Sequence, residues 1–255
     1  KSYSVKNTLC RITEDLIFTE PYMVHEHNHW TSPYLDETAA SLRDDWELKQ
    51  EVLELKRIFC ECSQSLIHGD LHTGSVMASK ENTWVFDSEF AFHGPMGFDI
   101  GAFIGNLFLS YFSQPGHATA EDDRLAMAQY TLQMVEETWT KFDSKFRALW
   151  TEKLLAKGAV GDTIPTQWGM PPASVLKREQ DSFLSKLLSD SLGFAGCKMI
   201  RRIVGFAHVA DLESIKNLEV RASCEKKAIA LARQMIVGRK TFSGIAAVIE
   251  LAKSC

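Results

Sequence analysis

The sequence lacks the glycine-rich loops that commonly hold nucleotide phosphates. None of its 15 glycines belongs to a G-x-G-x-x-G or a G-x-x-x-x-G-K-[ST] motif, the two patterns whose backbone N–H groups surround phosphate oxygens. Their absence leaves open a local pocket in which basic side chains bind phosphate.

Positive net charge, long apolar runs and paired cysteines are also missing. The formal net charge is -5, which argues against a nucleic-acid-binding surface. The longest apolar stretch, residues 98–112, carries Asp99 and Asn106 and is too short and too polar to span a bilayer. The six cysteines are scattered apart from Cys60 and Cys62, so free thiols in a reducing compartment are expected. These absences, with no targeting leader, predict a cytoplasmic protein without nucleic-acid or membrane partners.

Hydrophobic periodicity predicts a mainly helical chain with one small β-hairpin. Apolar residues on one face indicate a single amphipathic helix of about five turns over 42–59. Two short apolar runs around a turn at 79–82 predict strands at 76–78 and 84–86. Further helices are expected at 99–112, from about Thr119, at 177–191, 195–217 and 221–237, and after Thr241, with loops at 21–33 and 159–172. The predicted fold class is therefore α+β, mainly α-helical.

Acidic residues flank this hairpin in an order that suits phosphoryl transfer. Asp70 follows His68 and Gly69 in a loop, and Asp87 and Glu89 follow the second predicted strand. Phosphoryl transfer needs one carboxylate that orients the acceptor hydroxyl and others that hold Mg²⁺ against the nucleotide phosphates. Because side chains alternate along a strand, Asp87 and Glu89 are expected to face one side, and oxygen ligands suit Mg²⁺.

Each of these motifs has an ordinary explanation when it is taken alone. His-Gly-Asp occurs by chance, and most Asp-x-Glu pairs lie on solvated surfaces. Asp87 is harder to dismiss because it lies between the apolar runs 84–86 and 90–92. A loop aspartate, a hairpin and an acidic metal residue follow one another in this order in kinase catalytic lobes. Together the motifs predict the catalytic and metal-binding core of a phosphotransferase with the kinase superfold.

Longer segments resemble the 5-methylthioribose kinases, which belong with the aminoglycoside and choline kinases in the protein-kinase-like superfold. The segments are LIHGDLHTGS at 66–75, DSEFAF at 87–92 and GPMGFDIGA at 94–102, with WTSPYL at 30–35 and KMIRRIVG at 198–205. The resemblance covers most of the chain, and HTGS and GPMGFDIG are more specific than His-Gly-Asp. It implies that residues 1–255 form a kinase C-terminal lobe with the hairpin at the active site, and that the protein is a homodimer.

The resemblance also implies roles for the charged residues. Asp70 would be the base or orienting group for the sugar 1-hydroxyl, and Asp87 and Glu89 would bind Mg²⁺. Arg201 and Arg202 would contact the sugar or its transferred phosphate, since guanidinium groups bind phosphate oxygens in pairs. Without the family context, a solvated helix face would be the favoured interpretation of the two arginines.

Four more residues are expected around the site. His68 would brace the loop through hydrogen bonds, and Ser75 would support it from the position where many kinases place a metal-binding Asn. Asp99 would cap its own helix and anchor the catalytic loop. His72 would either line the substrate pocket or only pack.

Two departures from the family pattern qualify the resemblance. Ser88 stands between the paired acids where Pro is expected, which loosens the backbone but leaves both carboxylates. No lobe with a glycine-rich loop and a strand lysine precedes the catalytic loop at residue 68. Since the chain begins with Lys1 rather than methionine, we expect a fragment that lacks the nucleotide lobe and exposes apolar surface where that lobe would dock.

The implied activity is ATP-dependent phosphorylation of 5-methylthioribose to 5-methylthioribose 1-phosphate, a step of methionine salvage and hence of amino-acid biosynthesis. ATP would be the co-substrate, Mg²⁺ the cofactor, and this chain alone is expected to be inactive. Two alternatives stay open: a related kinase lobe for choline or an aminoglycoside, and a non-catalytic remnant that binds a sugar or a partner protein. The retained Asp70, Asp87 and Glu89 argue against long decay.

Overall fold

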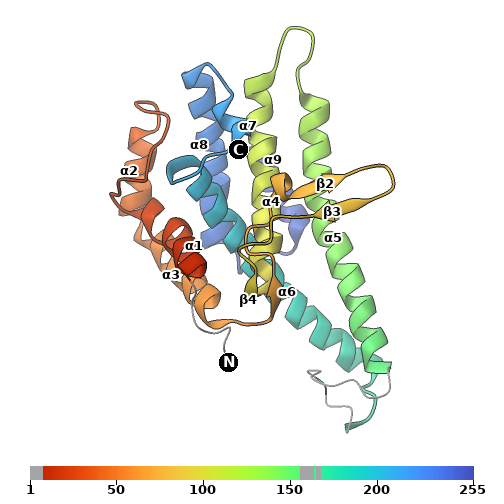
Figure 1. The fold of residues 1–255 in the computed structure, drawn as a ribbon. Helices are drawn as coiled ribbons and strands as arrows, with labels where there is room; N and C mark the ends of the chain where they lie inside the picture. The colour runs from red at the N-terminus through yellow and green to blue at the C-terminus, as the bar shows by residue number, and fades with distance from the viewer. Residues whose placement is uncertain (1–7, 156–163, 165–167) are drawn as a thin grey trace.

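Helices dominate the computed structural model, which describes residues 8–155, 164 and 168–255 (Figure 1). The helices are α1 (Thr8–Phe18), α2 (Asp36–Asp44), α3 (Trp46–Glu61), α4 (Met96–Ser113), α5 (Leu125–Leu155), α6 (Ala173–Val204), α7 (Ala210–Glu213), α8 (Leu218–Val237) and α9 (Ile245–Ser254). Short 3-10 turns lie at η1 (Glu20–Tyr22), η2 (Thr73–Ser75) and η3 (Gln114–His117). Two antiparallel strand pairs complete the fold, so the predicted α+β, mainly helical class is confirmed.

The two strand pairs lie next to the loops that carry the acidic residues. Strand β1 (Ser65–Ile67) pairs with β4 (Phe92–Gly94), and β2 (Val76–Ala78) pairs with β3 (Thr83–Val85). The β2–β3 hairpin was predicted from the sequence, and its strands end within one residue of the expected positions. The β1–β4 pair was not predicted, because its partners lie far apart in the sequence and each is only three residues long. In Figure 1 the turn of this hairpin projects at the edge of the molecule.

Helix α4 lies at the centre of the core, between α5 and α6 (Figure 1). Its glycines allow α6 to approach closely: a Cβ at Gly101 would lie 2.3 Å from the Ser191 carbonyl oxygen, and one at Gly105 would lie 2.8 Å from that of Ala195. Phe98 and Phe108 of α4 are fully buried. This packing fixes the position of α6 against the start of α4, where the polar loops meet.

Two helix predictions were wrong because capping and packing outweighed the local pattern. The helix expected over 42–59 is divided at Asp45, whose side chain accepts a hydrogen bond from the Leu48 N–H at 2.9 Å and so starts α3. The helices expected at 177–191 and 195–217 are one helix, α6, which continues to Val204. Gly193 and Gly196 do not interrupt it, because both are packed against distant parts of the chain: a Cβ at Gly196 would lie 2.5 Å from the Ala232 carbonyl oxygen of α8, and one at Gly193 would lie 2.7 Å from the Leu55 side chain of α3.

Smaller corrections concern helix starts. Helix α4 begins at Met96, before Asp99, with Pro95 as its N-cap. Thr119 does accept a hydrogen bond from the Asp122 N–H at 3.1 Å, but this forms a turn, and α5 begins only at Leu125. The helices expected at 221–237 and after 241 correspond to α8 and α9.

The predicted loops are partly covered by the structure. Residues 21–33 are irregular apart from the short turn η1, and most of the loop expected at 159–172 lies outside the described residues. Among the described helices, none is both long enough and apolar enough to cross a membrane.

Candidate active site

The loop between β1 and η2 is held by a carboxylate from α4. Asp99 accepts hydrogen bonds from the backbone N–H groups of His68 and Gly69 at 2.6 and 3.0 Å. Gly69 has a φ of +84°, and a Cβ there would lie 2.2 Å from the Phe90 carbonyl oxygen, so only glycine fits. Burial raises the pKa of Asp99 and the two N–H groups oppose that rise. Asp99 therefore anchors the loop, but the expectation that it caps its own helix was wrong, because Pro95 is the N-cap.

His68 connects this loop to the segment that carries the other acidic residues. Its Nε2 lies 2.8 Å from the Phe86 carbonyl oxygen, and its Nδ1 accepts a hydrogen bond from the Asp70 N–H at 3.3 Å. The two contacts assign the ring proton to Nε2. One imidazole thus joins the backbone at Asp70 to the residue that precedes Asp87.

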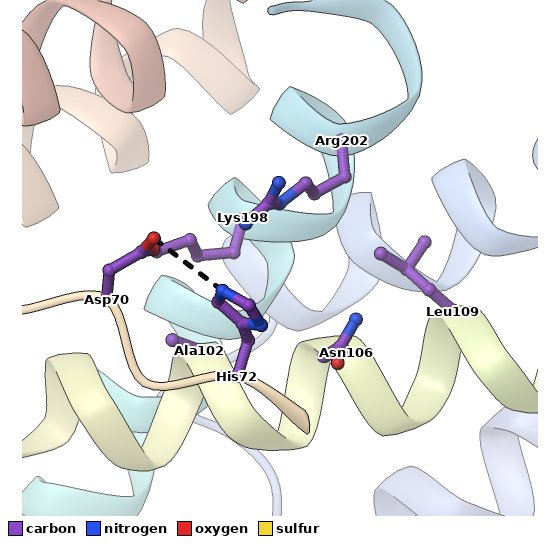
Figure 2. A pocket seen from close by; sticks show the side chains of 7 residues that line it. All are labelled: Asp70, His72, Ala102, Asn106, Leu109, Lys198 and Arg202. Carbon is purple, nitrogen blue, oxygen red and sulfur yellow. Dashed lines mark hydrogen bonds and ion pairs between the residues drawn. The ribbon is translucent and has the colours of Figure 1, made fainter. Parts of the chain in front are cut away.

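A buried lysine of α6 pairs with the loop aspartate (Figure 2). The Lys198 Nζ lies 2.8 Å from the Asp70 Oδ1, and the lysine is only 6% exposed. Burial by itself raises the pKa of Asp70, but attraction to Lys198, its hydrogen bond, and the charges of Arg202 and His72 outweigh that effect and lower the pKa to about 2. Asp70 is therefore a carboxylate throughout the neutral pH range.

Lys198 itself loses its proton at a lower pH than an ordinary lysine. Burial, with the neighbouring charges of Arg201 and Arg202, lowers the pKa of Lys198 to about 8 although Asp70 opposes the change. The pair remains an ion pair at pH 7.

The two adjacent arginines near the end of α6, Arg201 and Arg202, have different surroundings. Arg202 donates from Nη1 to the Ala207 carbonyl oxygen at 2.9 Å. Arg201 is 9% exposed, and its Nε and Nη1 are buried without a hydrogen-bond partner among the described residues. Burial and the charge of Arg202 lower the pKa of Arg201 to about 10. A buried guanidinium with free donors is suited to bind an anion.

Two cavities meet at the Asp70–Lys198 pair. One is lined by Asp70, His72, Ala102, Asn106, Leu109, Lys198 and Arg202, and Figure 2 shows these side chains around it. The other is bounded by Arg201 and Phe90 and by α1 residues 12, 13, 16 and 17. The ion pair is therefore accessible from both sides, with one arginine in each cavity.

His72 and Ser75 contact the Asp70 side chain and the backbone of the same loop. His72 lines the first cavity, with its Nε2 3.8 Å from the Asp70 Oδ2 and its Nδ1 accepting from the Gly74 N–H at 3.0 Å. Burial lowers the pKa of His72 although Asp70 opposes the change. Ser75 is buried and donates to the Asp70 carbonyl oxygen at 3.2 Å, so its hydroxyl supports the loop backbone.

Asp87 and Glu89 lie on an exposed segment beyond the hairpin. Strand β3 ends at Val85, and Asp87 has a φ of +66°, so the expectation that strand alternation orients both carboxylates was wrong. Both residues are exposed, and neither takes part in an ion pair within the described part of the chain. The structure thus divides the predicted site residues into a buried group around Asp70 and an exposed pair of carboxylates.

Lys198 is the residue of the buried group that sequence reasoning missed. It was noted only as part of the 198–205 run, although Lys198, Arg201 and Arg202 follow the i, i+3, i+4 spacing that places side chains on one helix face. The signal that could have found it is a lysine within the otherwise apolar run 192–200, because lysine is almost never buried unless it is paired.

Comparisons with known proteins show which family and which relatives the chain resembles. Residues 4–143 match the model of the phosphotransferase enzyme family. Methylthioribose kinase 1 of Oryza sativa subsp. japonica is 47% identical over 245 residues, which cover 94% of this chain and 55% of the relative. Methylthioribose kinase of Escherichia coli O45:K1 (strain S88 / ExPEC) is 45% identical over 251 residues, covering 98% of this chain and 59% of the relative. The chain thus spans somewhat more than half the length of these relatives.

Proposed function

The chain belongs to the phosphotransferase enzyme family, and on that basis we propose that it supplies the acceptor and metal half of a kinase that phosphorylates the 1-hydroxyl of 5-methylthioribose. The similarity to methylthioribose kinases over 94 to 98% of the chain supports this substrate. The product would be 5-methylthioribose 1-phosphate, and the reaction would serve methionine salvage.

The observation that carries the proposal is the Asp70 carboxylate between two cavities, paired with Lys198 at 2.8 Å. A carboxylate with a pKa of about 2 is a weak base, so its main action is to accept a hydrogen bond from the acceptor hydroxyl and orient it. The proton moves to Asp70 only as the new bond to phosphorus forms, because the hydroxyl becomes strongly acidic at that stage.

Arg201 and Arg202 supply positive charge for the transferred group. The unpartnered donors of Arg201 fit phosphate oxygens, and Arg202 lines the cavity that holds Asp70 and His72. Fixed donors of this kind stabilise charge on the transferred phosphoryl group without a reorganisation cost. Lys198 holds Asp70 in place and keeps it ionised.

Asp87 and Glu89 are the residues that would hold Mg²⁺. They are exposed, lie two residues apart and have no competing ion pair among the described residues, and carboxylate oxygens are the ligands that Mg²⁺ prefers. When bound, Mg²⁺ would neutralise charge on the phosphates of ATP, the co-substrate. The contact from His68 to Phe86 keeps this segment next to the catalytic loop.

The nucleotide lobe would dock on apolar surface around the hairpin. Large hydrophobic side chains are exposed on β1, on both hairpin strands and just beyond: Leu66, Met77, Trp84, Val85 and Phe86 are 40 to 68% exposed. Exposed apolar groups gathered in this way mark interaction surfaces. We propose residues 1–255 as the C-terminal lobe of the kinase, inactive without the lobe that binds the nucleotide.

Two measurements test the proposal. Calorimetry with 5-methylthioribose should show binding to this chain that is lost in Arg202→Met, while choline and an aminoglycoside do not bind. ATP turnover should be absent from this chain and appear when it is joined to the nucleotide lobe of a methylthioribose kinase. Turnover by the chain alone would contradict the lobe assignment, and binding of choline in place of the sugar would favour the related-kinase alternative.

Sugar binding without turnover in the joined protein would favour the non-catalytic alternative. Dimer formation remains a prediction of the family resemblance, and a cytoplasmic location remains a prediction from the sequence composition. Analytical ultracentrifugation of the joined protein tests the first of them.

A further inference from the structure

A second group of polar side chains lies outside the candidate active site, in the irregular segment after α1. Glu20 begins the turn η1, and the run HEHNH at 25–29 follows it. The ligand atoms of Glu20, His25 and His27 all lie within 4.8 Å of one another. We propose that these three residues form a binding site for a divalent transition-metal ion, with Zn²⁺ as the best-matched ion.

The distances between the donor atoms suit a tetrahedral ion. The Glu20 Oε2 lies 3.0 Å from the His27 Nδ1 and 3.6 Å from the His25 Nδ1. Ligands bound to zinc at about 2.0–2.1 Å are separated from each other by about 3.3 Å. Small side-chain rotations therefore place all three atoms on one ion, and water completes the coordination.

The segment is held in a form that a metal can use without refolding. The His27 N–H donates to the His25 Nδ1 at 3.3 Å, so this nitrogen carries a lone pair rather than a proton, and an ion would replace this long hydrogen bond. The His27 Nδ1, 3.0 Å from the Glu20 Oε2, would release its proton when the ion binds. The Asn28 side chain holds the loop by donating to the carbonyl oxygens of Glu20 and Met23 at 2.6 and 2.9 Å. The imidazole rings of His25 and His27 are inclined by 69°, so their in-plane lone pairs can converge.

The carboxylate is the unusual member of the group. The Glu20 side chain is only 10% exposed, and its ion-pair partners among the described residues are the two histidines. A buried carboxylate needs a compensating positive charge. The guanidinium of Arg201 also interacts with Glu20 electrostatically, so it competes with the ion for this carboxylate and links the metal group to the second cavity of the candidate active site.

A neighbouring group of similar composition is less suited to a metal ion. His29 and His208 lie near Glu213, but their rings are stacked at 3.9 Å and are parallel within 10°. Lone pairs in parallel rings do not converge on one point. Glu213 also lies 3.4 Å from the Arg221 Nη2, which already supplies a positive charge. This group serves as the internal control.

The choice of ion follows from the donor chemistry. Two imidazoles and one carboxylate suit zinc and similar borderline ions, whereas Mg²⁺ prefers oxygen ligands alone. A site for zinc would therefore be distinct from the Mg²⁺ ligands Asp87 and Glu89, both in position and in selectivity.

The test is titration of the whole chain with Co²⁺, followed by its visible absorption, and then displacement by Zn²⁺. We expect one equivalent bound without sulfur-to-cobalt charge-transfer bands, displaced by Zn²⁺ but not by excess Mg²⁺. Glu20→Gln and His27→Ala should each weaken binding at least about tenfold, since loss of even a supporting residue costs 10–100-fold. The matched control His29→Ala should bind as the wild type does.

Several outcomes would overturn the proposal. These are no binding, charge-transfer bands that show thiolate ligands, unchanged affinity in His27→Ala, or an effect of His29→Ala equal to that of His27→Ala. If Glu20→Gln fails to fold by circular dichroism, the double variant His25→Ala/His27→Ala decides the question, because its two side chains are partly or fully exposed.

Discussion

The two halves of the candidate site are built in opposite ways. Asp70 lies in a loop whose backbone is bonded to Asp99 and Ser75, and its carboxylate pairs with the buried Lys198. Asp87 and Glu89 lie on an exposed segment, have no ion pair among the described residues, and are tied to the loop through the contact between His68 and Phe86. The half to which we assign the acceptor is thus held by the fold, whereas the half to which we assign the metal is exposed and has few such contacts among the described residues.

This difference agrees with the tasks that we propose for the two halves. An acceptor hydroxyl must be held within a few tenths of an ångström of the reacting geometry, and this requires rigid support. Carboxylates that bind Mg²⁺ share the ion with water and phosphate oxygens, so much of their geometry is imposed by the ligand. Substitutions in the two halves should therefore differ in kind as well as in size.

The largest effect is expected from Asp70→Asn in the joined, active protein. Loss of the orienting carboxylate should lower kcat/KM by about 10²–10⁴-fold, and raising the Mg²⁺ concentration should not restore it. Asp87→Asn should also lower the rate, but higher Mg²⁺ should recover part of the activity. A coupled assay over a range of Mg²⁺ concentrations checks this, and the same Mg²⁺ response in both variants would contradict the division into two halves.

Asp99→Asn should destabilise the chain by about 1.5–3 kcal/mol. The reason is that a charged acceptor of two backbone N–H groups is replaced by a neutral one. Urea unfolding followed by circular dichroism measures the difference, and Glu89→Gln is the exposed control. A loss below 0.5 kcal/mol would mean that Asp99 does not hold the loop.

Lys198→Met should remove a pH-dependent contribution to stability of about 2 kcal/mol. The folded-state pKa of Asp70 is about 2, below its unfolded value near 3.8, so the pair stabilises the fold above about pH 4 and this stabilisation is lost as the pH falls through 2. Without Lys198, burial should raise the Asp70 pKa above its ordinary value.

The measurement for this variant is urea unfolding at several pH values between 2 and 6. The difference between wild type and Lys198→Met should shrink toward acid pH, and Lys198→Arg, which keeps the charge, should retain much of the effect. A difference that does not change with pH would show that packing, rather than the ion pair, is lost.

Arg201→Met should stabilise the unliganded chain by about 1 kcal/mol, because it removes a buried charge whose donors are unbonded. Arg202→Met is the matched comparison, and no gain is expected from it since Arg202 donates to the Ala207 carbonyl oxygen. Thermal unfolding with and without inorganic phosphate provides the measurement. Equal gains in stability in both variants would show that the unbonded donors of Arg201 do not cost more than the hydrogen-bonded donors of Arg202.

The smallest effects on folding belong to the metal half. Asp87→Asn and Glu89→Gln should each change the free energy of unfolding by less than about 0.5 kcal/mol, as is usual for exposed positions. Asn also tolerates the positive φ at residue 87, so no strain is added. A loss above 1 kcal/mol in either variant would show that the exposed segment takes part in the fold.

What could be predicted from the sequence was local. The β2–β3 hairpin follows from two apolar runs around a polar turn, whereas Asp70, Asp87 and Glu89 are proposed as site residues from their order along the chain. The break at Asp45 was missed because the apolar spacing continues across it, although Asp is a strong N-cap. The continuity of α6 through Gly193 was missed because the residues packed against it, Leu55 and Arg239, come from distant parts of the sequence.

The role of Lys198 could not be predicted from local patterns for a related reason. Its burial and its partner depend on how α6 packs on α4 and on the loop that Asp99 fixes, so a window of neighbouring residues contains no sign of the Asp70 carboxylate 128 positions away. The motif around Asp70 can thus be recognised from neighbouring residues, whereas the charged group that sets the pKa of Asp70 lies far away in the sequence.

The three cationic side chains on one face of α6 affect which acceptor molecules can enter the cavities at Asp70. Lys198, Arg201 and Arg202 surround a single carboxylate, so the cavity walls carry excess positive charge. A quaternary ammonium or a polyamine would be repelled before any contact with Asp70, while an uncharged polyol would approach without penalty. Selection among alcohols would then begin with charge exclusion at the entrance, ahead of any fit between the acceptor and its binding site.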